Sequence, residues 1–267
     1  MTDPDTLPLT WPEPGVALLT LNRPAALNAL SDDMVAELSA RLDSLADDRE
    51  LRVLILTGAG RAFCAGFDLS LAAAAPGEDE EGAAAAWSLR QERFAALITK
   101  LRGLRAPVIA AVNGSANGAG LALALGAEVR VAAASARFNA AFVKVGMTGC
   151  DMGVSWLLPR CVGSSRSFEI LLTGRMVDAG EAERIGLVSA TVPDVQLLPR
   201  ALAMAREIAA NDAFAVWMTK RGAWANLEAP GLAQAIELEN RSQILARSTG
   251  ALQRAAEALL ARRRSKA

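Results

Sequence analysis

The sequence predicts an α/β core followed by a helical C-terminal region. Through the first half of the chain, short apolar segments typical of strands alternate with helical patterns, as in α/β proteins. From residue 195 to the end, the segments have helical patterns and no strand pattern interrupts them. We therefore expect an α/β core over residues 1–193 and a helical region over residues 194–267. With 52% hydrophobic and 21% charged residues, the chain can bury a sizeable core.

The individual elements follow from local patterns. A helix is predicted at 31–48, because Ser31 can cap its first turn and apolar residues then recur on one face. A second helix is predicted at 83–101, and the acidic stretch GEDEE at 77–81 is predicted to be an exposed loop. Apolar and β-branched residues predict strands at 16–22, 51–57, 107–112 and 129–132.

Composition excludes several classes of function. A net charge of −1 gives no basic field for nucleic acid. The three cysteines are odd in number and show no CxxC spacing, which favours a reducing compartment. The N-terminus has no signal-peptide pattern, and the apolar runs are too short to cross a membrane. We therefore expect a cytoplasmic protein with no membrane span and no nucleic-acid partner.

The chain contains neither histidine nor tyrosine. A histidine base, a Ser-His-Asp triad and a phenolic acid are therefore all excluded. Cysteine and carboxylate side chains show no clustered spacing that would predict a metal site. Acid–base chemistry is left to carboxylate, lysine or cysteine.

Two Gly-rich turns each follow a predicted buried strand. GAGRAFCAGFDL spans 58–69, and NGSANGAGLAL spans 113–123. Gly66 and Gly118 let a ligand approach the backbone with no Cβ in the way. Two N–H groups that converge from such turns would form an oxyanion hole. For either stretch alone, glycines that only permit tight turns and close packing are the more common explanation.

Six motifs in order resemble the crotonase, or enoyl-CoA hydratase/isomerase, family. They are LNRPAALNAL (21–30), VLILTGAGRAFCAGFDL (53–69), PVIAAVNGSANGAGLALAL (107–125), LLPRCVG (157–163), LLTGRMVDAGEAERIGLV (171–188) and ELENRSQ (237–243). The resemblance implies a spiral of ββα units with C-terminal helices that build trimers, often paired into hexamers. It also implies an acyl-CoA thioester as the substrate, with coenzyme A as part of that substrate and no separate cofactor.

The resemblance carries site residues onto this chain. By position, the two oxyanion donors are the backbone N–H groups of Phe67 and Ala119. Two fixed dipoles there would stabilise the negative charge that develops on a thioester oxygen. The substrate-binding set implied by the same two turns is Ala65, Gly66, Phe67, Asp68, Leu69, Gly118 and Ala119. Asp68 is also explained by a capping or turn role.

Both glutamates of the usual hydratase are absent. Ala122 stands at the first position and Phe142 at the second, where Phe142 would line a drier acyl pocket. Asp151 falls where some crotonase-like isomerases keep a working Asp and where an aryl-CoA dehalogenase keeps its nucleophile. Asp151 is predicted at the start of a helix, which would keep it ionised. Helix capping alone would also explain it.

The sequence therefore predicts an enzyme of fatty-acid or related acyl-CoA metabolism that works through an oxyanion-stabilised enolate. Its hypothetical acid/base is Asp151, which fits a double-bond isomerase better than a hydratase. Two alternatives stay open. The loss of both glutamates favours a catalytically silent acyl-CoA-binding protein. A CoA-thioester hydrolase or dehalogenase would use Asp151 as a nucleophile.

Overall fold

The computed structural model describes residues 5–264 of the chain. The chain forms two compact units, Met1–Arg206 and Glu207–Ala267. The predicted α/β class with C-terminal helices is confirmed: every strand lies in the first unit, and the described part of the second unit is helical.

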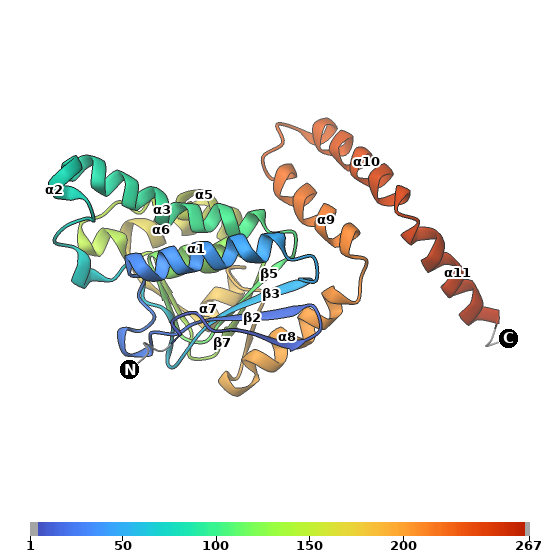
Figure 1. The fold of residues 1–267 in the computed structure, drawn as a ribbon, viewed down its shortest axis with the longest axis horizontal. Coiled ribbons are helices and arrows are strands. Elements are labelled where there is room, and N and C mark those ends of the chain that lie inside the picture. Colours follow the sequence, from blue (N-terminus) through green and yellow to red (C-terminus); the bar gives the residue numbers. More distant parts are fainter. Residues whose placement is uncertain (1–4, 265–267) are drawn as a thin grey trace. The chain divides into compact units, whose positions relative to one another are not determined.

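A six-stranded sheet forms the centre of the first unit (Figure 1). Its order is β1-β2-β3-β5-β7-β10; β1 is antiparallel to β2 and the other neighbours are parallel. Every residue of β3 and β5 is buried, as expected for parallel strands covered on both faces. The bounds are β1 Leu9–Glu13, β2 Val16–Leu21, β3 Val53–Gly58, β5 Val108–Val112, β7 Val129–Ala133 and β10 Ala190–Val192.

A second, four-stranded sheet carries the Gly-rich turns. Its order is β4-β6-β8-β9, with β9 antiparallel to β8 and the other pairs parallel. The strands β4, β6 and β8 follow β3, β5 and β7 directly along the chain, so three strands of the first sheet each lead into a strand of the second. The bounds are β4 Ala62–Cys64, β6 Ser115–Asn117, β8 Arg137–Asn139 and β9 Met176–Asp178.

Helices α1 and α3 pack against each other in the first unit (Figure 1). The predicted cap of α1 is confirmed, because the Ser31 hydroxyl accepts a hydrogen bond from the Met34 N–H. The α-helices are α1 Asp32–Asp47, α2 Glu78–Glu81, α3 Ala83–Gly103, α4 Ala119–Gly126, α5 Val154–Val162, α6 Ser164–Thr173, α7 Ala179–Arg184 and α8 Leu197–Ala209. Short 3-10 helices are η1 Pro24–Ala26, η2 Leu69–Leu71, η3 Ala141–Val145 and η4 Asp194–Gln196.

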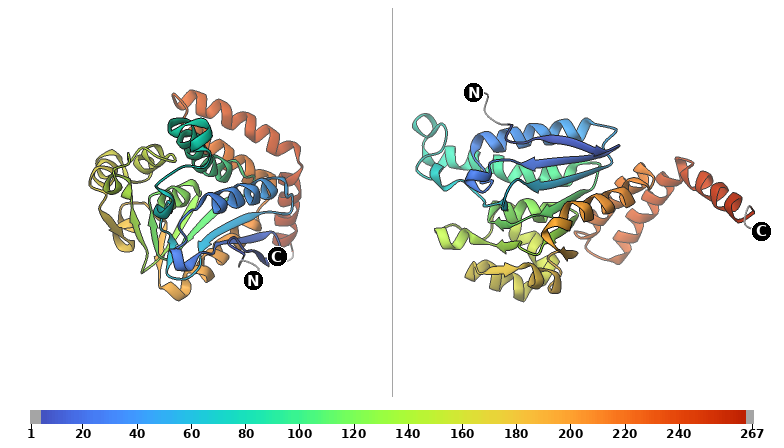
Figure 2. Two further views of the ribbon diagram at one scale, coloured as in Figure 1. Left: turned by 60° about the vertical axis from the view of Figure 1, so that its left-hand side comes forward. Right: turned by 90° about the horizontal axis from the view of Figure 1, so that it is seen from below.

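The second unit contains α9 (Ala213–Asn226), α10 (Leu232–Ser248) and α11 (Ala251–Arg264). Figure 2 shows α9 and α10 side by side and α11 continuing beyond the end of α10. Several large apolar side chains of α10 and α11 are exposed in the single chain.

The predicted long helices and strands are confirmed, but the short elements differ from the prediction. Residues 77–81 are not a loop throughout: Glu78–Glu81 form α2, because Gly77 turns the chain with a positive φ and the Glu78 carboxylate accepts from the Ala75 N–H. The three-residue strands of the second sheet are too short to show a periodic pattern. No helix among the described residues is long and apolar enough to cross a membrane.

Candidate active site

The two Gly-rich turns meet beside the second sheet. Residues 65–67 follow β4, and Gly118 follows the neighbouring strand β6. Gly66 has a φ of +101°, and a Cβ there would lie 2.8 Å from the Asn117 carbonyl oxygen and 3.5 Å from the Ala119 nitrogen. Only glycine suits this conformation and this close approach. The structure thus brings the predicted turns together.

Backbone hydrogen bonds fix the first turn on both sides of Phe67. The Ala65 N–H donates to Leu27 O (3.0 Å), and the Asp68 N–H donates to Leu30 O (3.0 Å). The Leu30 N–H donates to Gly66 O at 2.7 Å. Among the hydrogen bonds of residues 5–264, none has the Phe67 N–H as donor. A turn held on both sides therefore presents one N–H that has no acceptor among the described residues.

The second turn presents the Ala119 N–H in the same way. Gly118 has a φ of +50° and donates its own N–H to Asn139 O at 2.9 Å. Ala119 is the first residue of α4, where an N–H has no intrahelical acceptor, and within the described chain it donates to no other group. The helix dipole adds partial positive charge at this end. The Ala119 methyl is accommodated, because its backbone is outside the left-handed region.

Helix α4 lies directly on β4. A Cβ on Gly120 would fall 2.1 Å from the Cys64 carbonyl oxygen, so the two backbones are in contact at this point. Every residue of α4 is buried. The spacing between the two turns is therefore set by backbone packing rather than by flexible side chains.

The aromatic ring of Phe67 is held by α3. Its centroid lies 5.7 Å from that of Phe94 and 6.5 Å from that of Trp87, both in edge-on geometry. The Arg90 guanidinium lies 4.7 Å from the centroid of the Phe67 ring. Edge-on packing of two aromatic rings is energetically favourable, and so is a cation placed over the face of a ring.

Arg90 also joins three other segments. It is 3% exposed, and it forms a two-point ion pair with Asp32 at the start of α1 (2.8 and 2.6 Å). It donates to the carbonyls of Leu71 (3.0 Å) and Ala74 (3.2 Å). This buried guanidinium therefore fixes the loop after the first turn as well as the ring of Phe67.

Replacing Arg90 with Met should lower the free energy of unfolding by about 3 kcal/mol. The substitution leaves the Asp32 carboxylate and two carbonyls without their donor. Chemical denaturation of the two proteins measures the difference. Arg93→Met, an exposed position on the same helix, is the control and should change the stability by no more than ~0.5 kcal/mol.

Asp68 stabilises the first turn. Its carboxylate accepts from the Ser70 N–H and hydroxyl, and it pairs with Arg23 at 3.1 Å. Hydrogen bonds from Ser70, together with Arg23, hold the pKa of Asp68 below its usual range. The expected capping role is confirmed, since Asp68 caps η2. Leu69, the next residue, is exposed.

Asp151 lies in the link between η3 and α5. The prediction that it begins a helix is wrong: α5 starts at Val154 with Gly153 as its N-cap, and Asp151 instead offers its carbonyl to the Val154 N–H (2.8 Å). Its side chain is partly buried and accepts a hydrogen bond from Gln91 Nε2. Burial outweighs hydrogen bonding and raises the pKa of Asp151, whereas the predicted helix end would have lowered it.

Apolar side chains occupy the positions of the two missing glutamates. Ala122 is fully buried on α4. Phe142 is buried on η3, and its ring lies against Gly118, 3.5 Å from where a Cβ of that residue would be. The environment of the second turn is therefore apolar, with no carboxylate at either position.

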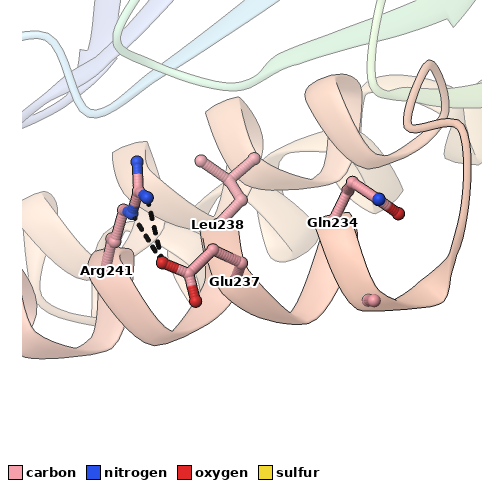
Figure 3. A pocket seen from close by; sticks show the side chains of 5 residues that line it. Gln234, Glu237, Leu238 and Arg241 are labelled. Atoms are coloured by element: carbon pink, nitrogen blue, oxygen red, sulfur yellow. Dashed lines mark hydrogen bonds and ion pairs between the residues drawn. The ribbon is translucent and has the colours of Figure 1, made fainter.

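Neither the buried thiol of Cys64 nor a metal-ligand cluster adds a second reactive centre among the described residues. Burial raises the pKa of the Cys64 thiol to about 12, so this thiol stays protonated and unreactive at neutral pH. In the part of the chain that the structure describes, no three acidic or cysteine side chains gather as metal ligands. Figure 3 shows a shallow groove on α10 in which Arg241 and Glu237 pair with each other (2.9 Å) beside Leu238 and Gln234.

Sequence reasoning missed Arg90 and Gln91. A signal for Arg90 exists, because it interrupts an otherwise apolar stripe of α3 formed by Ala86, Phe94, Leu97 and Leu101. A charged residue in such a stripe is buried only when it is paired. Gln91 gives no such signal, since it lies on the exposed side of the helix.

Known proteins match the chain along almost its whole length. The family model "Enoyl-CoA hydratase/isomerase" matches residues 12–265. The Mycobacterium bovis protein "Probable enoyl-CoA hydratase echA12" is 45% identical over 237 residues, which cover 88% of this chain and 83% of that protein. The 1,2-epoxyphenylacetyl-CoA isomerase of Escherichia coli is 39% identical over 256 residues, 96% of this chain and 95% of that protein.

Solved structures agree with this assignment. The crystal structure of a monofunctional enoyl CoA isomerase from M. smegmatis is similar with a TM-score of 0.74 at 44% identity, covering 86% of this chain and 98% of that one. The predicted crotonase fold with C-terminal helices is therefore confirmed, and the structure arranges its strands in two sheets. From its sequence, its fold and these matches, the chain belongs to the enoyl-CoA hydratase/isomerase family and is an enzyme of that class.

Proposed function

We propose that the chain moves the double bond of an enoyl-CoA thioester, with Asp151 as the acid/base and the Phe67 and Ala119 N–H groups as oxyanion donors. The observation that carries this proposal is a pair of N–H groups at converging turns, neither with an acceptor in the described chain, together with a partly buried carboxylate of raised pKa. Similarity to the E. coli and M. smegmatis isomerases supports it.

The oxyanion donors lower the barrier to forming an enolate. Removing the proton on C2 of a 3-enoyl thioester places negative charge on the thioester oxygen. Two fixed N–H dipoles bind this oxygen more strongly than the neutral carbonyl, which is the requirement for catalysis. Because the donors are backbone groups, the proposal does not depend on the side chains of Phe67 and Ala119.

One carboxylate suffices for the proton transfer. In this proposal Asp151 takes the proton from C2 and returns it to C4, which yields the 2-enoyl thioester. The raised pKa of Asp151 supports this role, because a more basic carboxylate removes a carbon-bound proton more readily. Hydration would require a second group to activate water, and Ala122 and Phe142 offer none.

The substrate-binding set in this proposal is the two turns with Phe142. Residues 65–69 and Gly118–Ala119 surround the thioester carbonyl, and the Phe142 ring provides an apolar wall for the acyl group. Asp68 contributes by fixing the turn rather than by touching substrate. Coenzyme A enters as part of the substrate.

Incubation in D2O with 2-hexenoyl- and 3-hexenoyl-CoA, followed by mass spectrometry, tests the function. A moved double bond with deuterium gained at carbon is the expected result. Tight binding without exchange would instead mean a silent acyl-CoA-binding protein. A trapped acyl-enzyme on Asp151, formed with release of CoA, would mean covalent thioester hydrolysis.

The described C-terminal helices also support an oligomer. We propose a homotrimer or a dimer of trimers, in which α10 and α11 are covered by other copies. The support is their exposed apolar side chains, among them Ile244 at 68% and Leu245 at 51% exposure. Patches of this kind on a single chain mark interaction surfaces.

Replacing Ile244 with Asp should shift the protein toward smaller species, because a charge would be buried at the contact. Sedimentation velocity over a range of concentrations measures the shift. Gln243→Asp, an exposed polar neighbour on α10, is the control for added charge. An oligomer that is unchanged by Ile244→Asp would remove α10 from the contact.

A further inference from the structure

We propose that Gln91 is a positioning residue for Asp151: its side-chain amide, delivered by α3, holds the carboxylate in place and favours the ionised form. The inference rests on the proposed function of Asp151. Gln91 Nε2 donates to Asp151 Oδ1, and this is the one side-chain hydrogen bond to Asp151 among the described residues.

The backbone around Asp151 does not by itself fix the carboxylate. Asp151 lies outside any helix or strand. The next two residues, Met152 (φ +43°) and Gly153 (φ +77°), adopt left-handed conformations, so the chain turns sharply here. A non-glycine residue in this region is strained and persists where the surroundings enforce it. Met152 is 4% exposed, which anchors the turn, and its backbone N–H together with the Gln91 side chain stabilises the carboxylate.

Helix α3 links Asp151 to the first oxyanion turn. Gln91 contacts Asp151, and the preceding residue, Arg90, lies over the ring of Phe67. The helix is 21 residues long and is anchored by buried Phe94 and Leu97. Gln91 thus holds the base, Asp151, and Arg90 holds the turn that carries the Phe67 N–H. Because both residues belong to one helix, they fix the separation of Asp151 from that turn. Catalytic groups are most effective when such supports limit their movement.

A neutral amide suits a base better than a cation would. The hydrogen bond from Gln91 stabilises the carboxylate, whereas burial destabilises it, and the resulting pKa lies above the ordinary value for Asp. A nearby Lys or Arg would lower the pKa further and weaken the base. Gln91 therefore favours the ionised form of Asp151 without placing a cation beside it.

Charged side chains of the surrounding elements do not determine the pKa of Asp151. Titratable side chains lie on α3, on η3, on α5 and in the link that precedes α5. Those nearest in sequence to Gln91 or Asp151 are Arg90, Glu92, Arg93, Lys144, Cys150 and Arg160. Arg90 is paired with Asp32, and Arg160 lies over Trp156 at 3.6 Å. Within the described chain, the pKa of Asp151 responds to burial, to Gln91 and to the Met152 N–H.

Two substitutions separate the hydrogen bond from simple packing. Gln91→Met removes the donor at similar size, and Gln91→Glu places a second carboxylate beside Asp151. Both should raise the pKa of Asp151, the first by about one unit and the second by more, because like charges add to the loss of the donor. Glu92→Gln, the exposed neighbouring residue, is the matched control and should leave the pKa unchanged.

The pKa is read directly by NMR of carboxyl-13C-labelled aspartate, with Asp151→Asn identifying the resonance. The same proteins are assayed for kcat/KM with 3-hexenoyl-CoA across pH. A base is active when ionised, so a raised pKa moves the acidic limb of the profile to higher pH by the same amount. Matching shifts of resonance and limb are the expected result.

The outcomes separate this inference from the proposed function. A resonance that titrates identically in wild type, Gln91→Met and Gln91→Glu overturns the role of Gln91, whatever the activity. A resonance that shifts while the rate profile stays in place supports the contact between Gln91 and Asp151. That second result would overturn Asp151 as the base.

Discussion

Asp151→Asn is expected to reduce the isomerisation of 3-hexenoyl-CoA, and deuterium uptake at carbon, by about 10²- to 10⁴-fold. Asparagine has nearly the same shape, and its Oδ1 can still accept the hydrogen bond from Gln91, so the local structure should persist. The substitution removes only the ability to take and return a proton. Its effect should therefore fall on kcat, while substrate binding at the two turns remains.

The control is Asp79→Asn, which changes an exposed carboxylate of α2. Its rate should equal that of the wild type, and both variants should unfold at the wild-type temperature. Full exchange activity in Asp151→Asn would contradict the proposed mechanism and would require another base. Loss of exchange together with a stable acyl-enzyme in the wild type would favour nucleophilic chemistry instead.

Much of the fold could be predicted because its long elements have regular patterns. Strands β3 and β5 are wholly buried, and their continuous apolar runs predict this directly. Helix α1 has both a capping Ser31 and an apolar face. Strands β4, β6 and β8 have three residues each, so pairing partners far along the chain, rather than local pattern, determine them.

The sequence allows the prediction that the two turns meet, because they resemble each other. It does not predict the geometry in which they meet. Gly66 and Gly118 are visible in the sequence, whereas the hydrogen bonds that leave the Phe67 N–H free come from Leu27 and Leu30, some 40 residues earlier in the chain. The same limit applies to Asp151. Burial raises its pKa, and the hydrogen bond that opposes this shift comes from Gln91, 60 residues away; neither is visible in the local sequence.

Gly66→Ala is expected to lower kcat by about 10²- to 10³-fold, the effect of losing one oxyanion donor. The new Cβ would lie 2.8 Å from the Asn117 carbonyl, a backbone atom that cannot move without moving the second turn. Alanine also resists a φ of +101°, at a cost of about 1–3 kcal/mol. Both effects displace the N–H of the next residue, Phe67, from the position that the oxyanion requires.

Gly82→Ala separates the two contributions. Gly82 also has a positive φ (+82°), but no heavy atom lies within 4 Å of a Cβ built there. The control should therefore lose stability through the backbone alone and retain its kcat. Thermal unfolding and kcat for 3-hexenoyl-CoA, measured on both variants, test this comparison.

If Gly66→Ala loses stability but keeps the wild-type kcat, the first turn does not hold the reacting carbonyl. A loss of kcat far beyond that of Gly82→Ala, at comparable stability, would instead place the reaction at the Phe67 N–H. Such a result would also explain why this position tolerates only glycine while Ala119 tolerates a side chain. Ala119 donates from the first turn of a helix with ordinary backbone angles, whereas Phe67 depends on a neighbour in a conformation that side chains rarely adopt.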